Sequence, residues 1–143
     1  MMQIGQVRAQ SGFSLIEVLV TMVVVALGLL GFAGLQAHSL KSNRTSLQRS
    51  YATMLAYDII DCMRVNRAGA DAAGYNINIG TPAVAGGIAG NDLVNWKTAL
   101  GTSLPGGDGS VVVNNRNVTV TVQWNENVSS ARTLTFQTQS SLW

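Results

Sequence analysis

The chain has 143 residues, of which 47% are hydrophobic and only 11% are charged. This length leaves room for one modest domain beside a membrane segment. The formal net charge is +2, and the basic residues are scattered, so the composition offers no positively charged stripe for nucleic acid. The single cysteine, Cys62, excludes an intramolecular disulfide.

A long apolar stretch begins near the amino terminus. Residues 13–35 would form a helix of about 35 Å, enough to cross a hydrocarbon layer of about 30 Å. No formally charged residue lies between Val18 and Leu40, but Glu17 stands near the start of the stretch. A carboxylate at the bilayer centre costs about 3 kcal/mol. The sequence therefore predicts a membrane helix whose one carboxylate has a partner or a role.

A cut between Gly12 and Phe13 would supply such a partner. The new amino terminus would be a cation four residues before Glu17. One helical turn does not bring a chain's own terminus and this side chain into an ideal pair, whereas a neighbouring copy shifted along the axis does. The helix dipole also favours a carboxylate near a helix start, by roughly 0.3–1 kcal/mol where it is exposed.

Gly12, Phe13 and Glu17, within the sequence GFSLIE and its apolar continuation, resemble the class III signal of type IV pilins and type II secretion pseudopilins. In that family a prepilin peptidase cuts after the glycine and N-methylates the new phenylalanine. The resemblance implies that Gly12 and Phe13 are the processing site and that Glu17 is the assembly carboxylate. It also implies a cytoplasmic leader, a single pass through the bacterial inner membrane with the head in the periplasm, and later transfer to the pilus.

Simpler explanations compete with this one. The apolar core is longer than the roughly 7–15 residues of an ordinary secretory signal, and a plain single-pass anchor leaves Glu17 unexplained.

The distribution of basic residues on the two sides of the apolar stretch argues against the membrane orientation that the resemblance implies. Arg8 precedes the span and Lys41, Arg44 and Arg49 follow it, which alone would place the carboxyl-terminal side in the cytoplasm. We follow the resemblance, because the peptidase acts on the cytoplasmic side.

Four segments are predicted along the chain. Residues 1–12 form a cleaved leader, 13–35 the membrane half of a long helix, 36–68 its amphipathic half, and 69–143 a globular head. Gly69, after Arg64 and Arg67, is expected to end the helix. The apolar side chains of the amphipathic half recur near helical spacing and are expected to face the head: Leu40, Leu47, Tyr51, Met54, Leu55, Ile59 and Cys62.

The first part of the head is predicted to be a long connecting loop, residues 69–90, with a short strand at 75–79. Asn91 is expected to cap a short helix whose apolar face carries Leu93, Trp96 and Leu100. The sequence LPGGDG, residues 104–109, then predicts a turn.

Alternating residues predict the strands of the head. Val118, Val120, Val122 and Trp124 alternate with polar residues, and residues 133–137 show the same period of two. A further strand at 110–113 is expected to join the first through a turn at 114–116. The predicted fold class is α+β and pilin-like, with a long helix packed on a small antiparallel sheet of three to four strands.

No residues stand at the spacing of an active site or a metal site. His38 has no second ligand nearby in the sequence, and Cys62 is expected to be a small core residue. Asp108 is a single carboxylate, too few for a dedicated calcium site. Asp58 and Asp61 lie at helical spacing from the arginines at 64 and 67 and are expected to form surface ion pairs. We predict no enzyme, no cofactor, no metal and no nucleic-acid motif.

The rest of the chain resembles minor pilins of the PilV type, in residues 57–67, 92–96, 104–109 and the Gln123–Trp124 pair before the last strand. The resemblance implies a protein that initiates or modifies type IV pilus assembly, supporting twitching motility, adhesion or DNA uptake. Implied partners are other minor and major pilins, the prepilin peptidase, the inner-membrane assembly platform, and membrane lipid before assembly. A type II secretion minor pseudopilin, a membrane-anchored periplasmic binding protein and, least of all, an enzyme remain alternatives.

Overall fold

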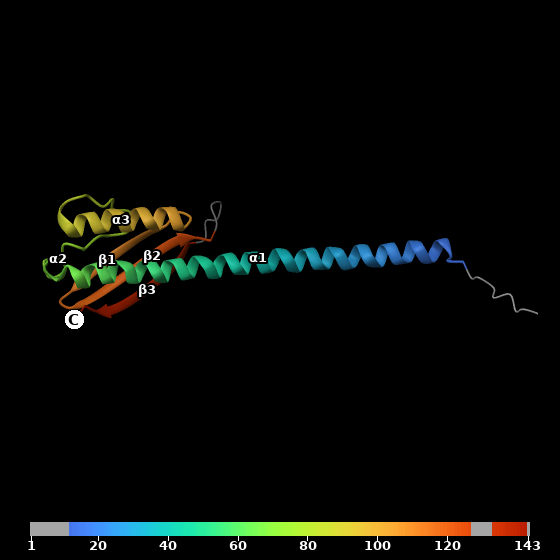
Figure 1. Cartoon of the computed structure of the whole chain (residues 1–143), viewed down its shortest axis with the longest axis horizontal. Helices are drawn as coiled ribbons and strands as arrows, with labels where there is room; N and C mark the ends of the chain where they lie inside the picture. The colour runs from blue at the N-terminus through green and yellow to red at the C-terminus, as the bar shows by residue number, and fades with distance from the viewer. Residues whose placement is uncertain (1–11, 127–132, 143) are drawn as a thin grey trace, which may run out of the picture. The chain divides into compact units, whose positions relative to one another are not determined.

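The structure is a computed structural model that describes residues 12–126 and 133–142. The predicted leader lies outside these residues except for Gly12. The elements in chain order are α1 (Leu15–Val65), α2 (Arg67–Asp71), α3 (Gly87–Ser103), β1 (Asp108–Asn114), β2 (Asn117–Asn125) and β3 (Thr133–Ser141) (Figure 1). The chain forms two compact units with their boundary between Lys41 and Ser42, and α1 contributes residues to both.

The second unit contains a three-stranded antiparallel sheet in the order β1-β2-β3. Val120 of the central strand pairs with Val111 on one side and Thr138 on the other, and both registers run without interruption. Every second residue of β2 is buried, beginning with Val118 and ending with Trp124. The period of two in the sequence therefore predicted this strand and its buried face correctly.

The carboxyl-terminal part of α1 covers the valine face of the sheet. Its buried residues are Gln48, Ala52, Leu55, Ala56, Ile59, Ile60 and Met63, and they belong to one core with the buried residues of β1, β2 and α3. The indole N–H of Trp96 on α3 donates to the backbone oxygen of Leu55 at 2.9 Å. These contacts confirm the predicted α+β, pilin-like fold class, with three strands.

The predicted inner face of α1 was partly wrong. Leu40, Leu47, Tyr51 and Met54 are exposed. Two apolar stripes run along this part of the helix, and periodicity alone does not say which one faces the sheet. The buried stripe contains alanines at 52 and 56, whose small side chains allow the helix to lie close to the valines.

The long helix ends earlier than predicted, at Val65. The side chain of Asn66 accepts a hydrogen bond from the backbone N–H of Gly69 at 3.3 Å and so caps the short helix α2. Gly69 therefore lies inside α2 and does not terminate α1. Asparagine is a favoured residue at this position, because the oxygen of its short side chain can accept a hydrogen bond from a backbone N–H of the first helical turn.

Two further boundaries differ from the prediction. The expected strand at 75–79 is only a single bridge between Ile77 and Val111. The second head helix, α3, begins at Gly87 and not after Asn91, which lies in its second turn. The start at Gly87 has a physical reason, since this residue has a φ of +62°, a conformation in which glycine has no steric penalty.

Candidate functional site

The predicted processing site lies at the start of α1, where the backbone changes from non-helical to helical. Gly12, Phe13 and Ser14 precede the helix, and Phe13 is 85% exposed. A Cβ atom built on Gly12 would meet nothing within 4 Å. Among the described residues, nothing covers the bond after Gly12 or requires glycine at this position.

Ser14 begins α1 as its amino-terminal cap. Its backbone oxygen accepts from the N–H groups of Glu17 and Val18, at 3.0 and 3.2 Å, and its hydroxyl oxygen accepts from the N–H of Ile16 at 3.4 Å. Serine followed three residues later by glutamate is the pattern of a capping box. This role of Ser14 was readable from the sequence, but the prediction did not include it.

Glu17 lies in the first turn of α1, where the helix dipole favours a negative charge. Its residue is exposed, and within residues 12–126 and 133–142 no salt bridge joins its carboxylate. Gly12, Phe13 and Glu17 thus lie within five residues of one another, on an exposed helix start.

The following residues form a helix suited to a bilayer. All residues from 12 to 44 are exposed, including the large apolar side chains, and α1 is the one described helix long and apolar enough to cross a membrane. From Leu15 to Leu35 it rises about 31 Å at 1.5 Å per residue. The hydroxyl of Thr21 donates to the backbone oxygen of Val18 at 2.8 Å, so this polar side chain is satisfied within the helix.

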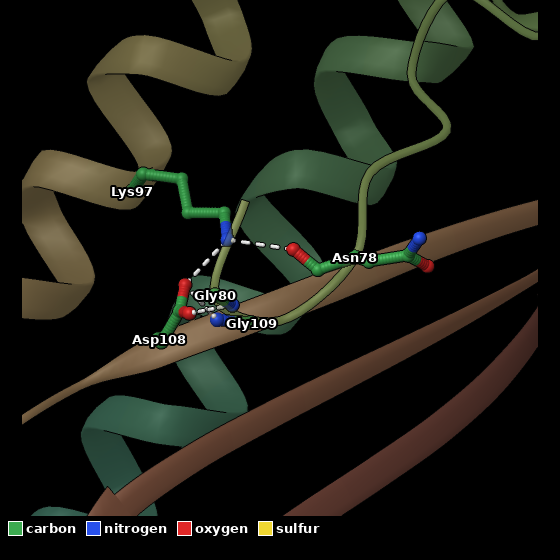
Figure 2. A network of polar contacts seen from close by, with 5 residues as sticks. All are labelled: Asn78, Gly80, Lys97, Asp108 and Gly109. Atoms are coloured by element: carbon green, nitrogen blue, oxygen red, sulfur yellow. Dashed lines mark hydrogen bonds and ion pairs between the residues drawn. The ribbon is translucent and has the colours of Figure 1, made fainter. Parts of the chain in front are cut away.

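The head contains a polar network that sequence reasoning missed (Figure 2). Lys97 on α3 forms an ion pair with Asp108 at the start of β1 and also donates to the backbone oxygen of Asn78, at 3.1 Å. The other oxygen of the Asp108 carboxylate accepts from the backbone N–H of Gly80 at 2.6 Å. The network fastens residues 78–80 to α3 and β1, and it uses Asp108 structurally.

The pKa of Asp108 is lowered. Burial alone would raise it, but the hydrogen bonds from Lys97 and from the backbone N–H groups of Gly80 and Gly109 outweigh burial. A carboxylate with a lowered folded-state pKa stabilises the fold above its unfolded pKa, about 3.9, and this contribution is lost as the pH falls through the folded pKa.

We therefore expect Asp108→Asn to lower the free energy of unfolding at pH 7 by about 1–2 kcal/mol, because it removes a hydrogen-bonded charge. The same variant should lose less stability than the wild type when the pH falls below about 4. Urea unfolding of the full chain in detergent, followed by tryptophan fluorescence, measures both effects. Asp58→Asn is the control, and an equal loss of stability in both variants would contradict the role of Asp108.

A second polar cluster joins the ends of α1 and α3. The hydroxyl of Tyr75 donates to Asp92 at 2.5 Å and accepts from the side-chain N–H of Asn66 at 3.1 Å. Burial, together with the hydrogen bond to Asp92, raises the pKa of Tyr75 to about 12. The tyrosine therefore stays protonated at physiological pH and acts as a buried connector.

Cys62 lies beside this cluster, partly buried against the core. Burial, with the nearby carboxylates of Asp92, Asp58 and Asp61, raises the pKa of its thiol. A thiol that stays protonated is a poor nucleophile, which agrees with the expected packing role. The expected surface ion pair is present between Asp61 and Arg64, at 2.8 Å. Among the described residues, no group of three or more His, Cys, Asp and Glu is placed to hold a metal.

Comparison with known families identifies one segment of the chain. A family model described as the prokaryotic N-terminal methylation motif matches residues 7–33, which include Gly12, Phe13, Glu17 and most of the apolar stretch. A search of curated proteins finds no match, and a search of solved structures finds none either. The chain therefore carries an amino-terminal methylation motif of the kind typical of type IV pilins and pseudopilins, and the match ends before the head begins.

Proposed function

We propose that the protein is a minor pilin of the PilV type that initiates or modifies type IV pilus assembly. The observation that carries the pilin-like part of this proposal is the methylation motif at residues 7–33, which coincides with a capped, exposed helix start holding one carboxylate. The PilV subtype rests on the resemblance in residues 57–67, 92–96 and 104–109. The prepilin peptidase would cut after Gly12 and methylate the amine of Phe13. Before assembly, α1 would anchor the chain in the inner membrane with the head in the periplasm.

Assembly would depend on Glu17. The carboxylate has no salt-bridge partner within the described residues, and the amine of a processed Phe13 on a neighbouring pilin has the opposite charge. In hydrocarbon both charges are costly when alone, so their pairing favours one axial register between adjacent helices. The exposed apolar stripe of α1, with Leu47, Tyr51 and Met54, offers a further surface for helices of other minor and major pilins.

The proposed role is structural, as is typical of pilin-like proteins that carry this motif. The polar clusters around Asp108 and Tyr75 are used in fastening loops to helices. The proposal includes support of twitching motility, adhesion or DNA uptake through the pilus. A type II secretion minor pseudopilin would share every feature of the motif, and co-purification with pilus or with secretion components separates the two.

Gly12→Val tests the processing step. We expect the variant to keep its leader, because a β-branched side chain should not fit a peptidase site that accepts glycine. Co-expression with the prepilin peptidase, followed by mass spectrometry, measures the fraction cut, which we expect to fall at least tenfold. The described residues leave open space at Gly12, so a loss of cutting would report recognition by the peptidase and not misfolding of the head.

Gly28→Ala is the matched control for this experiment. Gly28 also has nothing within 4 Å of a built Cβ atom, but it lies in the apolar helix away from the cut. We expect normal processing of the control. Efficient cutting of Gly12→Val after residue 12 would contradict the assigned processing site.

A further inference from the structure

The two outer edges of the sheet differ in how they are covered. At the β1 edge, Val111 exchanges both backbone hydrogen bonds with Ile77, at 3.0 and 2.9 Å, and Val113 donates to the side chain of Asn76 at 2.7 Å. At the other edge, β3 pairs with β2 on one side, and no described strand lies on its other side. Figure 1 shows β3 on the side of the sheet away from α3. Among the described residues, the β1 edge is thus partly covered and the β3 edge has no strand beside it.

The open strand also lacks the usual protections of an edge. Residues 133–141 read TLTFQTQSS, with no charge, no proline and no glycine, and a charged side chain reaches the strand near its end, where Arg64 of α1 donates to the hydroxyl of Ser140 at 3.0 Å. The register from Asn117↔Ser141 to Asn125↔Thr133 contains no bulge. Natural edge strands are normally blunted by lysines, prolines or bulges, because their unpaired backbone groups recruit other strands. In an antiparallel sheet, every second residue of β3 directs its N–H and C=O groups outwards.

The side chains of β3 indicate what kind of strand would fit. Leu134 and Phe136, on the inner face, are only partly buried, whereas Val120 and Val122 of the central strand are fully buried. On the outer face the side chains are neutral and polar. A neighbouring strand would complete the cover of Leu134 and Phe136 if it carried apolar residues on that face and neutral polar residues on the other.

We propose that β3 is a docking edge to which an extended segment of another protein adds as a fourth strand, along residues 134–140. The segment would be uncharged, with alternating apolar and polar side chains, and backbone hydrogen bonds would supply most of the contact. A second copy of β3 does not fit, because antiparallel pairing centred on Gln137 would place Ser140 and Thr138 opposite Leu134 and Phe136 and would leave these apolar side chains without apolar neighbours. The proposal does not depend on pilus assembly.

Hydrogen exchange on the full chain in detergent micelles tests this edge. The probe is a synthetic peptide with the sequence of Asn117–Asn125, because this segment is uncharged and has the required alternation of apolar and polar residues. We expect the peptide to slow exchange at alternate amides of residues 134–140 by a factor of about ten or more. No slowing at saturating peptide, or slowing confined to α1, would overturn the proposal.

Gln137→Lys and Thr121→Lys form a matched pair for this experiment. Gln137 and Thr121 lie opposite each other in the β2–β3 register and on the same face, but only Gln137 is on the open strand. We expect Gln137→Lys to abolish the slowing, since a charge on an edge disfavours strand addition, and Thr121→Lys to retain it. Unfolding midpoints of both variants are measured first, and if either does not fold, the pair is replaced by Gln139→Lys and Thr119→Lys, which lie opposite each other in the same register. Equal slowing in both variants would also overturn the proposal.

Discussion

Glu17→Ala is expected to remove the protein from pili while leaving it inserted in the membrane. The apolar helix loses its one carboxylate and so enters the bilayer at least as readily as before. The amine of a neighbouring Phe13 would lose its partner, and breaking a buried pair by removing one member costs about 3–5 kcal/mol. We therefore expect incorporation into sheared pili to fall at least tenfold, while the amount in the membrane fraction stays unchanged.

Two variants act as controls for Glu17→Ala. Glu17→Asp keeps the charge on a shorter side chain and should retain part of the incorporation. Thr21→Ala, one turn further along α1, removes a hydroxyl that bonds only to the helix's own backbone, so incorporation should be normal. Immunoblots of pilus and membrane fractions measure all three. Normal piliation and incorporation in Glu17→Ala would exclude the assembly role of the carboxylate.

Gly107→Ala is expected to destabilise the head strongly. A Cβ atom on Gly107 would lie 2.2 Å from the backbone oxygen of Leu100 and 2.9 Å from the Cβ of Leu104. Backbone atoms of α3 do not move aside cheaply, so we expect a loss of about 2–3 kcal/mol, as in overpacked cores. Urea unfolding of the full chain in detergent, followed by tryptophan fluorescence, measures the loss.

Gly101→Ala adds the same methyl group nearby without the clash. Its Cβ atom would meet only the backbone oxygen of Gly107, at 3.9 Å, and Gly101 lies inside α3. An alanine in a helix interior is favoured over glycine by about 0.5–1 kcal/mol, so this variant should be slightly more stable than the wild type. Equal stability of the two alanine variants would contradict the close packing at Gly107.

The features predicted correctly from the sequence are those set by neighbouring residues. The apolar run after Glu17 and the alternation from Val118 to Trp124 are local patterns, and both gave the right element with the right buried or exposed faces. The amino-terminal motif is equally local, whereas the roles of Gly12, Phe13 and Glu17 within it stay predictions. The match to the methylation motif covers the same stretch.

The features that the sequence did not predict depend on contacts between distant residues. Leu47, Tyr51 and Met54 have helical spacing, yet the sheet lies against the stripe with Ala52 and Ala56. The choice between two apolar stripes is made by packing, which periodicity does not contain.

The polar clusters of the head also depend on contacts between residues that are distant in the sequence. Lys97 and Asp108 lie 11 residues apart on different elements, and Tyr75 meets Asp92 across 17 residues. No spacing rule links such pairs before the helix and the sheet are placed. The open edge of β3 likewise becomes visible only when the strand order is known.

Mass spectrometry of the amino terminus of the native protein is the decisive measurement for processing at Gly12. We expect a polypeptide that begins at Phe13, with one methyl group on its amine and without residues 1–12. A native polypeptide that retains residues 1–12, with no shortened species detectable beside it, would show that this cut does not take place.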